Sequence, residues 1–240
     1  MKRDLRQSRD GELLIEGKSL PVTFRRRANA RRIILRIDRS GLGIVLTLPH
    51  YASQRAALTF AASEKDWILE RIARSPVRVP FAPGQRIPLR GRSHRIEATG
   101  GRGTVRLLGG PEPAIQVPGG MAHVGRRLVD WLKRQAALDL ARASHAHAER
   151  LGVRFTRVVV RDTASRWGSC SSSGTLSYCW RLVLAPPFVL DYVAAHEVAH
   201  LKEMNHGRRF WSLVQMLCPQ AEMARSWLKT HGNGLHLYGQ

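Results

Sequence analysis

The 240-residue sequence predicts an α+β fold, in which a β-rich N-terminal half with one helix precedes a half that combines helices with short strands. Two observations lead to this class. Between residues 21 and 120, apolar residues alternate in short runs separated by glycine and proline, apart from one helical stretch. From residue 121 onward a helical period dominates, and short alternating runs return directly before an apolar helical segment.

Composition narrows the class further. The chain is 43% hydrophobic and 24% charged, as in globular proteins. No apolar run approaches the roughly 20 residues that span a bilayer, and the charged start lacks the apolar core of a signal peptide. Three cysteines are too few for a disulfide framework. We therefore expect a cytoplasmic protein without a membrane partner.

The net charge of +21 attracts anionic partners such as nucleic acid or nucleotides. The chain contains 33 arginines and 6 lysines. A coding bias towards arginine would produce the same excess without any partner, so the charge alone does not specify one. A cluster from Arg25 to Arg32 is either an anion-binding edge or a solvated edge strand protected by charge.

Residues 1–20 are expected to form a polar arm and residues 21–120 the β-rich region. Alternation on both sides of the "DRSG" turn predicts a hairpin over residues 33–48. A single helix is predicted over residues 53–75 from the apolar stripe Ala57, Ala61, Ile68 and Ile72. Small hairpins are expected between residues 77 and 120.

Residues 121–240 are expected to form a second region. Its longest helix covers residues 121–150, with Gly152 as a terminator. His145 and His147, two positions apart on that helix, point in different directions and are expected to be surface or packing residues. The runs "RFTRVVVRD", "ASRWGSC" and "LSYCWRLVLAP" predict strands. Pro186 and Pro187 then start a helix that is expected to reach about Met204.

The segment "HEVAHLKEMNH", residues 196–206, carries the strongest chemical signal. His196 and His200 lie one turn apart on one helix face and can bind one zinc ion, while Glu197 lies beside them as a base. The neighbouring residues are apolar, and burying these polar groups without a metal would be costly.

A catalytic zinc needs a third protein ligand. Asn205 tolerates the left-handed conformation, and a chain reversal there would return His206 to the metal. We therefore prefer His206 as the third ligand. The other candidates are Glu203, Glu222, His231 and His236.

The run from "SRWGSCSSSGTLSYCWRL" to "HEVAHLKEMNHGRRFW" resembles the YgjP-like metallopeptidases, distant relatives of SprT-type zinc proteases, and the resemblance extends from about residue 20 to 236. It implies a zincin-like catalytic half, with the active-site helix packed on a small antiparallel sheet. It also implies zinc held by His196, His200 and His206, with Glu197 as general base. Cys179 and Ala164 depart from residues often found in the family.

The transition state needs a further stabilising group near the metal. Candidates for substrate or oxyanion contacts are Arg166, Tyr178, Arg181 and Tyr192, which lie in the strands and helix start around the motif. Cys170 is expected to be a packing residue. An extended peptide could add to the edge of the small sheet, at "SRWGSC" or "SYCWRL".

The sequence therefore predicts a zinc-dependent hydrolase, and a metallopeptidase that acts on polypeptides is the preferred form. Two alternatives stay open. One is a zinc hydrolase of nucleotide phosphoanhydrides, in which arginines would bind the phosphates. The other is a basic, nucleic-acid-associated protein whose zinc only stabilises the fold.

Overall fold

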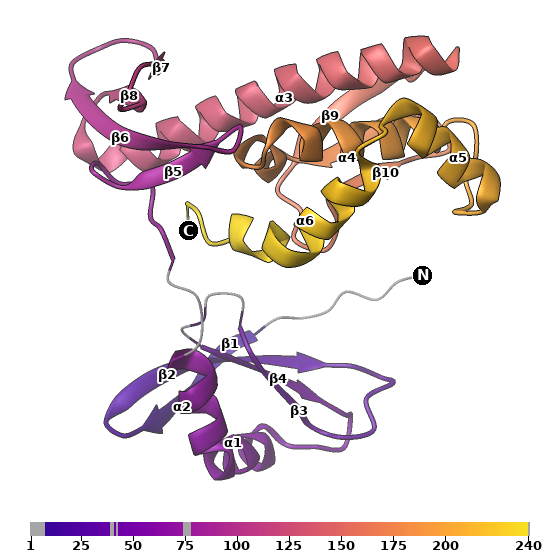
Figure 1. Ribbon diagram of the computed structural model, residues 1–240. Helices are drawn as coiled ribbons and strands as arrows, with labels where there is room; N and C mark the ends of the chain where they lie inside the picture. Colours follow the sequence, from indigo (N-terminus) through magenta and orange to yellow (C-terminus); the bar gives the residue numbers. More distant parts are fainter. Residues whose placement is uncertain (1–7, 39–40, 42, 74–77, 240) are drawn as a thin grey trace. The chain divides into compact units, whose positions relative to one another are not determined.

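The structure is a computed structural model that describes residues 8–38, 41, 43–73 and 78–239. The chain divides into two compact units, Met1–Val77 and Arg78–Gln240, which are described separately (Figure 1). The α+β class is confirmed. The division, however, falls after residue 77 and not near residue 120, where the sequence suggested a boundary.

Unit 1 contains a four-stranded sheet of order β1-β2-β4-β3, formed by β1 (Ser8–Ile15), β2 (Lys18–Arg26), β3 (Ile34–Ile37) and β4 (Ile44–Leu48). The predicted hairpin is β3–β4, which pairs Ile37 with Ile44 and Leu35 with Leu46. The expected polar arm is wrong for its described part, because β1 pairs along its length with β2 and buries Leu13 and Ile15.

The predicted helix over residues 53–75 is two helices, α1 (Gln54–Ser63) and α2 (Lys65–Ala73). Ser53 caps α1 by accepting a hydrogen bond from the Ala56 amide at 3.1 Å. Glu64 leaves helical geometry, with φ −96° and ψ 20°. Ala57, Ala61 and Ile68 of the predicted stripe are fully buried against the sheet. The prediction that these residues face the core is therefore confirmed, although two helices replace the single predicted one.

Unit 2 begins with a second four-stranded sheet, of order β5-β6-β8-β7. Its strands are β5 (Arg86–Leu89), β6 (Arg92–Gly100), β7 (Arg106–Leu108) and β8 (Ala114–Pro118). Ile87, Ile96 and Ile115 of this sheet are buried in the same cluster as Leu128 and Leu132 of the following helix. This shared core explains why residues 78–120 belong to unit 2.

The long helix is α3 (Val124–Leu151), preceded by a 3-10 turn (Met121–His123) and closed by Gly152 at φ 66°, as predicted. It is followed by a three-stranded sheet of order β10-β11-β9, formed by β9 (Arg157–Arg161), β10 (Gly168–Cys170) and β11 (Thr175–Cys179). This sheet is mixed and not wholly antiparallel, because β9 pairs parallel with β11.

The strand predicted through "WRLVLAP" stops at Cys179, and Trp180–Leu184 forms a 3-10 helix. All five residues of this helix are buried, so their side chains lack the alternation of a half-buried strand. The chain then forms α4 (Pro187–Ala199), α5 (Arg208–Leu217) and α6 (Ala221–Leu235). No helix in the described part of the chain combines the length and apolarity needed to cross a bilayer.

The β5–β6 turn supports the segment that leads into α4. Gly91 adopts φ 76°, and a Cβ at this position would lie 3.0 Å from the Cα of Pro186. The Arg90 amide donates to the Val183 carbonyl at 2.7 Å. The turn therefore packs tightly against the residues before the helix.

Gly91→Ala is expected to lower the free energy of unfolding by about 3 kcal/mol, because left-handed strain is added to a steric contact with Pro186. Gly84→Ala is the matched control. Gly84 has φ 84° with nothing within 4 Å of its Cβ position, so only the strain of about 1 kcal/mol is expected there. Urea unfolding measures both values. Equal losses in the two variants would contradict the proposed packing.

Candidate metal centre

Helix α4 carries the candidate site and is buried on nearly all sides. Pro187 stands at its first turn, where the missing amide hydrogen costs nothing. The helix contacts α3, α5, α6 and strand β10, so its residues from Tyr192 to Ala199 are buried apart from the half-buried His196 (Figure 1). An apolar helix inside a core therefore holds His196 and Glu197, and His200 directly follows it.

His196, His200 and His206 converge on one point. One ring nitrogen from each can be chosen so that all three lie within 4.8 Å of one another. The Nε2 atoms of His196 and His206 are 3.2 Å apart. Two nitrogens bound to one tetrahedral ion at 2.0–2.1 Å would be about 3.3 Å apart. The three imidazoles therefore fit a single metal ion.

The way the chain reverses after α4 differs from the prediction. The helix ends at Ala199 instead of continuing to about Met204, because the Leu201 and Lys202 amides donate to carbonyls three residues back, at 3.0 and 3.1 Å. Asn205 does not adopt a positive φ, so the left-handed reversal expected there is wrong. Gly207 is extended, with φ −81°, and α5 begins after it.

The environment favours the neutral imidazoles of His196 and His200. Burial, and then the charges of His200, His206 and Arg225, lower the pKa of His196 to about 4. Burial also lowers the pKa of His200. The Nδ1–H of His200 donates to the Glu203 carbonyl at 3.1 Å, which leaves its Nε2 lone pair for a metal. The nitrogens are thus available as ligands at neutral pH.

Glu197 is 4% exposed and lies against Gly168 of β10. A Cβ at residue 168 would meet Oε1 of Glu197 at a sterically forbidden distance, so only glycine leaves room for this carboxylate. Burial raises the pKa of Glu197 to about 8, and the Arg166 guanidinium opposes that rise. Sequence reasoning missed the role of Gly168, because β10 is distant from α4 along the chain.

The ring of Phe210, from α5, contacts all three imidazoles. Its ring centroid lies 4.9, 4.5 and 4.7 Å from those of His196, His200 and His206, and the residue is fully buried. Trp211 packs against Phe210 and His206. These contacts hold the third histidine after the reversal.

Two of the predicted substrate contacts lie inside the protein. Tyr178 is 1% exposed, and its hydroxyl is hydrogen-bonded to Ser144 at 2.9 Å. Arg181 is 2% exposed and donates to Asp162 and to the carbonyls of Leu235 and Tyr238. Tyr178 nevertheless lines a cavity of about 290 Å³ together with Arg166 and Gly168. Arg181 joins the C-terminal segment to the core.

The other two predicted contacts lie beside the site. Arg166 is exposed and close enough to Glu197 to affect its pKa. The Tyr192 ring packs edge-on against His196 at 5.9 Å, and burial raises the pKa of its hydroxyl to about 12. These two residues therefore lie beside the candidate metal centre.

The remaining candidate ligands are engaged elsewhere: Glu222 with Arg225, His231 with Trp227, and His236 with Trp167. Glu203 meets His200 through its backbone carbonyl.

His147 is buried and bonds Asp191 at 2.8 Å, and His145 packs on Phe155. The prediction that His145 and His147 are surface or packing residues agrees with these positions. Cys170 packs against the core as expected.

An open groove of about 900 Å³ lies beside the third histidine. It is lined by residues of α5 and the turn before it: His206, Gly207, Arg208, Trp211, Ser212, Gln215 and Met216. Strand β10, which contacts α4, is at an edge of its sheet, whereas β11 is central. Of the two peptide-binding edges considered, "SRWGSC" lies in a strand without a second neighbouring strand among the described residues, whereas the strand of "SYCWRL" lies between two others.

Three clustered histidines, with a buried carboxylate beside them and an open groove next to them, characterise a metal-dependent hydrolase. The chain belongs to the YgjP-like family, since residues 31–231 match the model "YgjP-like, metallopeptidase domain". This match includes parts of both units. The protein is accordingly a metal-dependent hydrolase of a metallopeptidase family.

A comparison with curated proteins finds no match. Among solved structures, the chain is similar to the crystal structure of the metallopeptidase zymogen of Pyrococcus abyssi abylysin. The identity is 22%, the alignment covers 38% of this chain and 92% of that one, and the TM-score is 0.36.

Arg181→Met is expected to lower the free energy of unfolding by about 3 kcal/mol, because buried carbonyls of the C-terminal segment lose their charged donor. Arg157→Met, at an exposed position of β9, is the control and should change stability by less than about 0.5 kcal/mol. Chemical unfolding measures both. If Arg181→Met unfolds like the parent and loses only substrate affinity, Arg181 is a substrate contact instead.

Proposed function

We propose that the protein is a zinc-dependent metallopeptidase in which His196, His200 and His206 hold one zinc ion and Glu197 is the general base. The observation that carries this proposal is the convergence of three imidazoles beside a buried carboxylate. Nitrogen ligands of this number and type suit zinc and leave a fourth position open.

When bound, zinc supplies Lewis acidity and lowers the pKa of a coordinated water to near neutrality. Glu197 accepts the proton of the attacking water and later delivers it to the leaving amine. Without a cation, burial raises the pKa of this carboxyl to about 8, so that the protonated form predominates at neutral pH. A positive charge nearby favours its ionised, proton-accepting form.

Contacts around Glu197 restrict its position. On the β10 side Gly168 leaves room for the carboxylate, which lies against the backbone of that strand. Tyr192, which packs on His196, and Arg166, whose charge acts on Glu197, are the residues we assign to substrate or oxyanion binding. Because no described strand pairs with the second edge of β10, an extended peptide could pair with that edge next to the base.

The polypeptide substrate is supported by the family and by the open groove beside His206. A phosphoanhydride substrate would require arginines directed at the metal. Arg225, which affects His196, is instead stacked 4.7 Å over Trp211 and paired with Glu222. Arg166 is then the arginine left beside the site, and the match to a metallopeptidase family makes nucleotide hydrolysis the less favoured alternative.

Glu197→Gln should reduce hydrolysis of fluorescein-labelled casein by about 1,000-fold while one zinc ion per chain remains bound, because the amide cannot accept a proton. Glu203→Gln is the control, since Glu203 meets the site only through its backbone carbonyl. Activity and zinc content are measured on the same samples. Full activity in Glu197→Gln would contradict the assignment, and Glu197-dependent hydrolysis of ATP but not casein would favour the nucleotide alternative.

Gly168→Ala should lower kcat by at least about tenfold with zinc still bound, because the new methyl group displaces Glu197. Gly207→Ala is the control: it adds the same methyl group next to His206, where nothing lies within 4 Å. Steady-state kinetics on both variants decide. Unchanged kcat in Gly168→Ala would show that Glu197 is not positioned by β10.

A further inference from the structure

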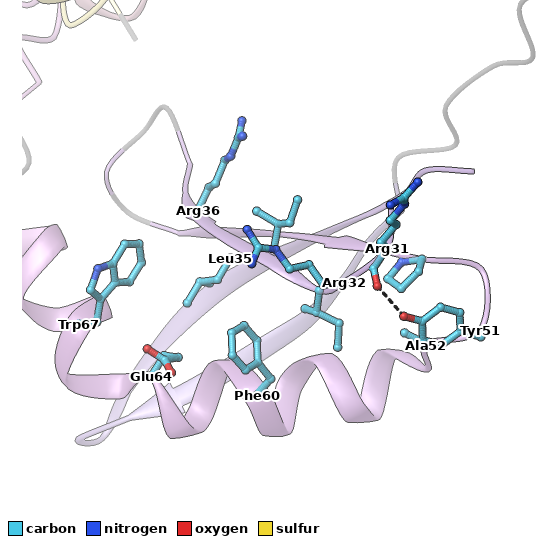
Figure 2. A pocket seen from close by; sticks show the side chains of 12 residues that line it. Arg31, Arg32, Leu35, Arg36, Tyr51, Ala52, Phe60, Glu64 and Trp67 are labelled. Carbon is cyan, nitrogen blue, oxygen red and sulfur yellow. Dashed lines mark hydrogen bonds between the residues drawn. The ribbon is translucent and has the colours of Figure 1, made fainter. Parts of the chain in front are cut away.

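We propose that unit 1 contains a binding site for an extended acidic polypeptide, in a groove along the free edge of β3. We call this the β3 groove; it is about 800 Å³ in volume and is lined by Arg31, Arg32, Ile33, Ile34, Leu35, Arg36, Pro49, Tyr51, Ala52, Phe60, Glu64 and Trp67 (Figure 2). None of these residues belongs to the proposed catalytic chemistry, so the inference stands independently of it.

The groove follows the edge of the strand and not one of its faces. Four consecutive residues, from Ile33 to Arg36, line it. Successive side chains of a strand point to opposite faces, so a cavity that all four reach must lie along the strand edge. The sheet order β1-β2-β4-β3 leaves that edge without a neighbouring strand among the described residues.

A free strand edge presents unpaired amide and carbonyl groups that another extended chain can pair with. Here the opposite wall is formed by Phe60 of α1, by Glu64 and by Trp67 of α2. Figure 2 shows Phe60 and Trp67 on the helical side and Arg32 extending toward Leu35 above Phe60. A strand edge with an apolar wall facing it provides both backbone pairing and side-chain pockets.

Charge specifies the class of peptide. Arg31, Arg32 and Arg36 are exposed, and no hydrogen bond or ion pair within the described residues engages their guanidinium groups. Glu64 supplies the carboxylate in the lining, against these three cations. Residues 1–77 contain 16 basic and 8 acidic side chains, a net charge of +8. An acidic strand would therefore be complementary to the groove.

The lining also contains exposed apolar surface. Tyr51 is 79% exposed and Trp67 is 39% exposed, and Ile34 and Leu35 are half-buried. Arginines alone would suffice to keep a strand edge from aggregating, and they would not require an apolar wall. The combination fits a strand in which acidic residues alternate with aliphatic ones, so that one face meets the arginines and the other the aromatic wall.

The test uses the full chain with Glu197→Gln, to prevent cleavage, and a fluorescein-labelled, end-capped peptide of roughly eight residues in which glutamate and aliphatic residues alternate. Fluorescence anisotropy should show saturable binding. Arg32→Glu should weaken it by about fivefold or more through loss of an ion pair and new repulsion. Arg55→Glu on α1 makes the same charge change outside the groove and should leave binding within about twofold.

Further measurements distinguish an acidic peptide from other possible occupants of the β3 groove. The same peptide with glutamine in place of glutamate should bind more weakly, and Trp67→Ala should weaken the acidic peptide as well. Equal losses in Arg32→Glu and Arg55→Glu would overturn the proposal, because they would indicate general charge attraction. Preferential binding of a labelled single-stranded oligonucleotide that depends on Arg32 would overturn it too. So would concentration-dependent dimerisation abolished by Arg32→Glu, since a second copy would then occupy the edge.

Discussion

The site depends on one constraint, the burial of polar groups. Three imidazoles and a carboxylate lie on or directly beside a helix that is otherwise surrounded by apolar contacts. Burial penalises the charged forms, lowering the pKa of His196 to about 4 and raising that of Glu197 to about 8. Both shifts leave uncharged groups in a site without a cation. A bound divalent ion offsets the cost by using the imidazole lone pairs and stabilising the carboxylate charge. Burial thus makes these polar groups costly without a metal ion, and the same burial favours the binding of a metal ion.

The surrounding elements hold these groups at the required separations. Phe210 lies against all three histidine rings and fixes the returning His206. Gly168 gives Glu197 its space on the side of β10. The β5–β6 turn packs on the residues before α4, through Gly91 and Pro186. Unit 2 therefore contains the complete candidate metal centre, and unit 1 offers a separate basic groove beside a free strand edge.

Features with a local cause were predictable from the sequence, and features that depend on distant contacts were not. The spacing of His196 and His200 follows from helix geometry, and Gly152 ends α3 in the left-handed conformation that glycine favours. The return of His206 was anticipated, but its mechanism was not, because tight turn bonds after Ala199 replace a left-handed Asn205. The buried roles of Tyr178 and Arg181 depend on Ser144 and the C-terminal segment, which no local pattern reveals. The unit boundary was misplaced for the same reason.

Zinc K-edge X-ray absorption on the purified protein tests the central claim most directly, because it identifies the atoms around the ion without requiring a substrate. Three imidazole nitrogens and one further light atom at about 2.0–2.1 Å are expected. A sulfur shell at about 2.3 Å would show that a cysteine such as Cys170 takes part. That result, or a protein purified and reconstituted without stoichiometric zinc, would contradict the three-histidine centre.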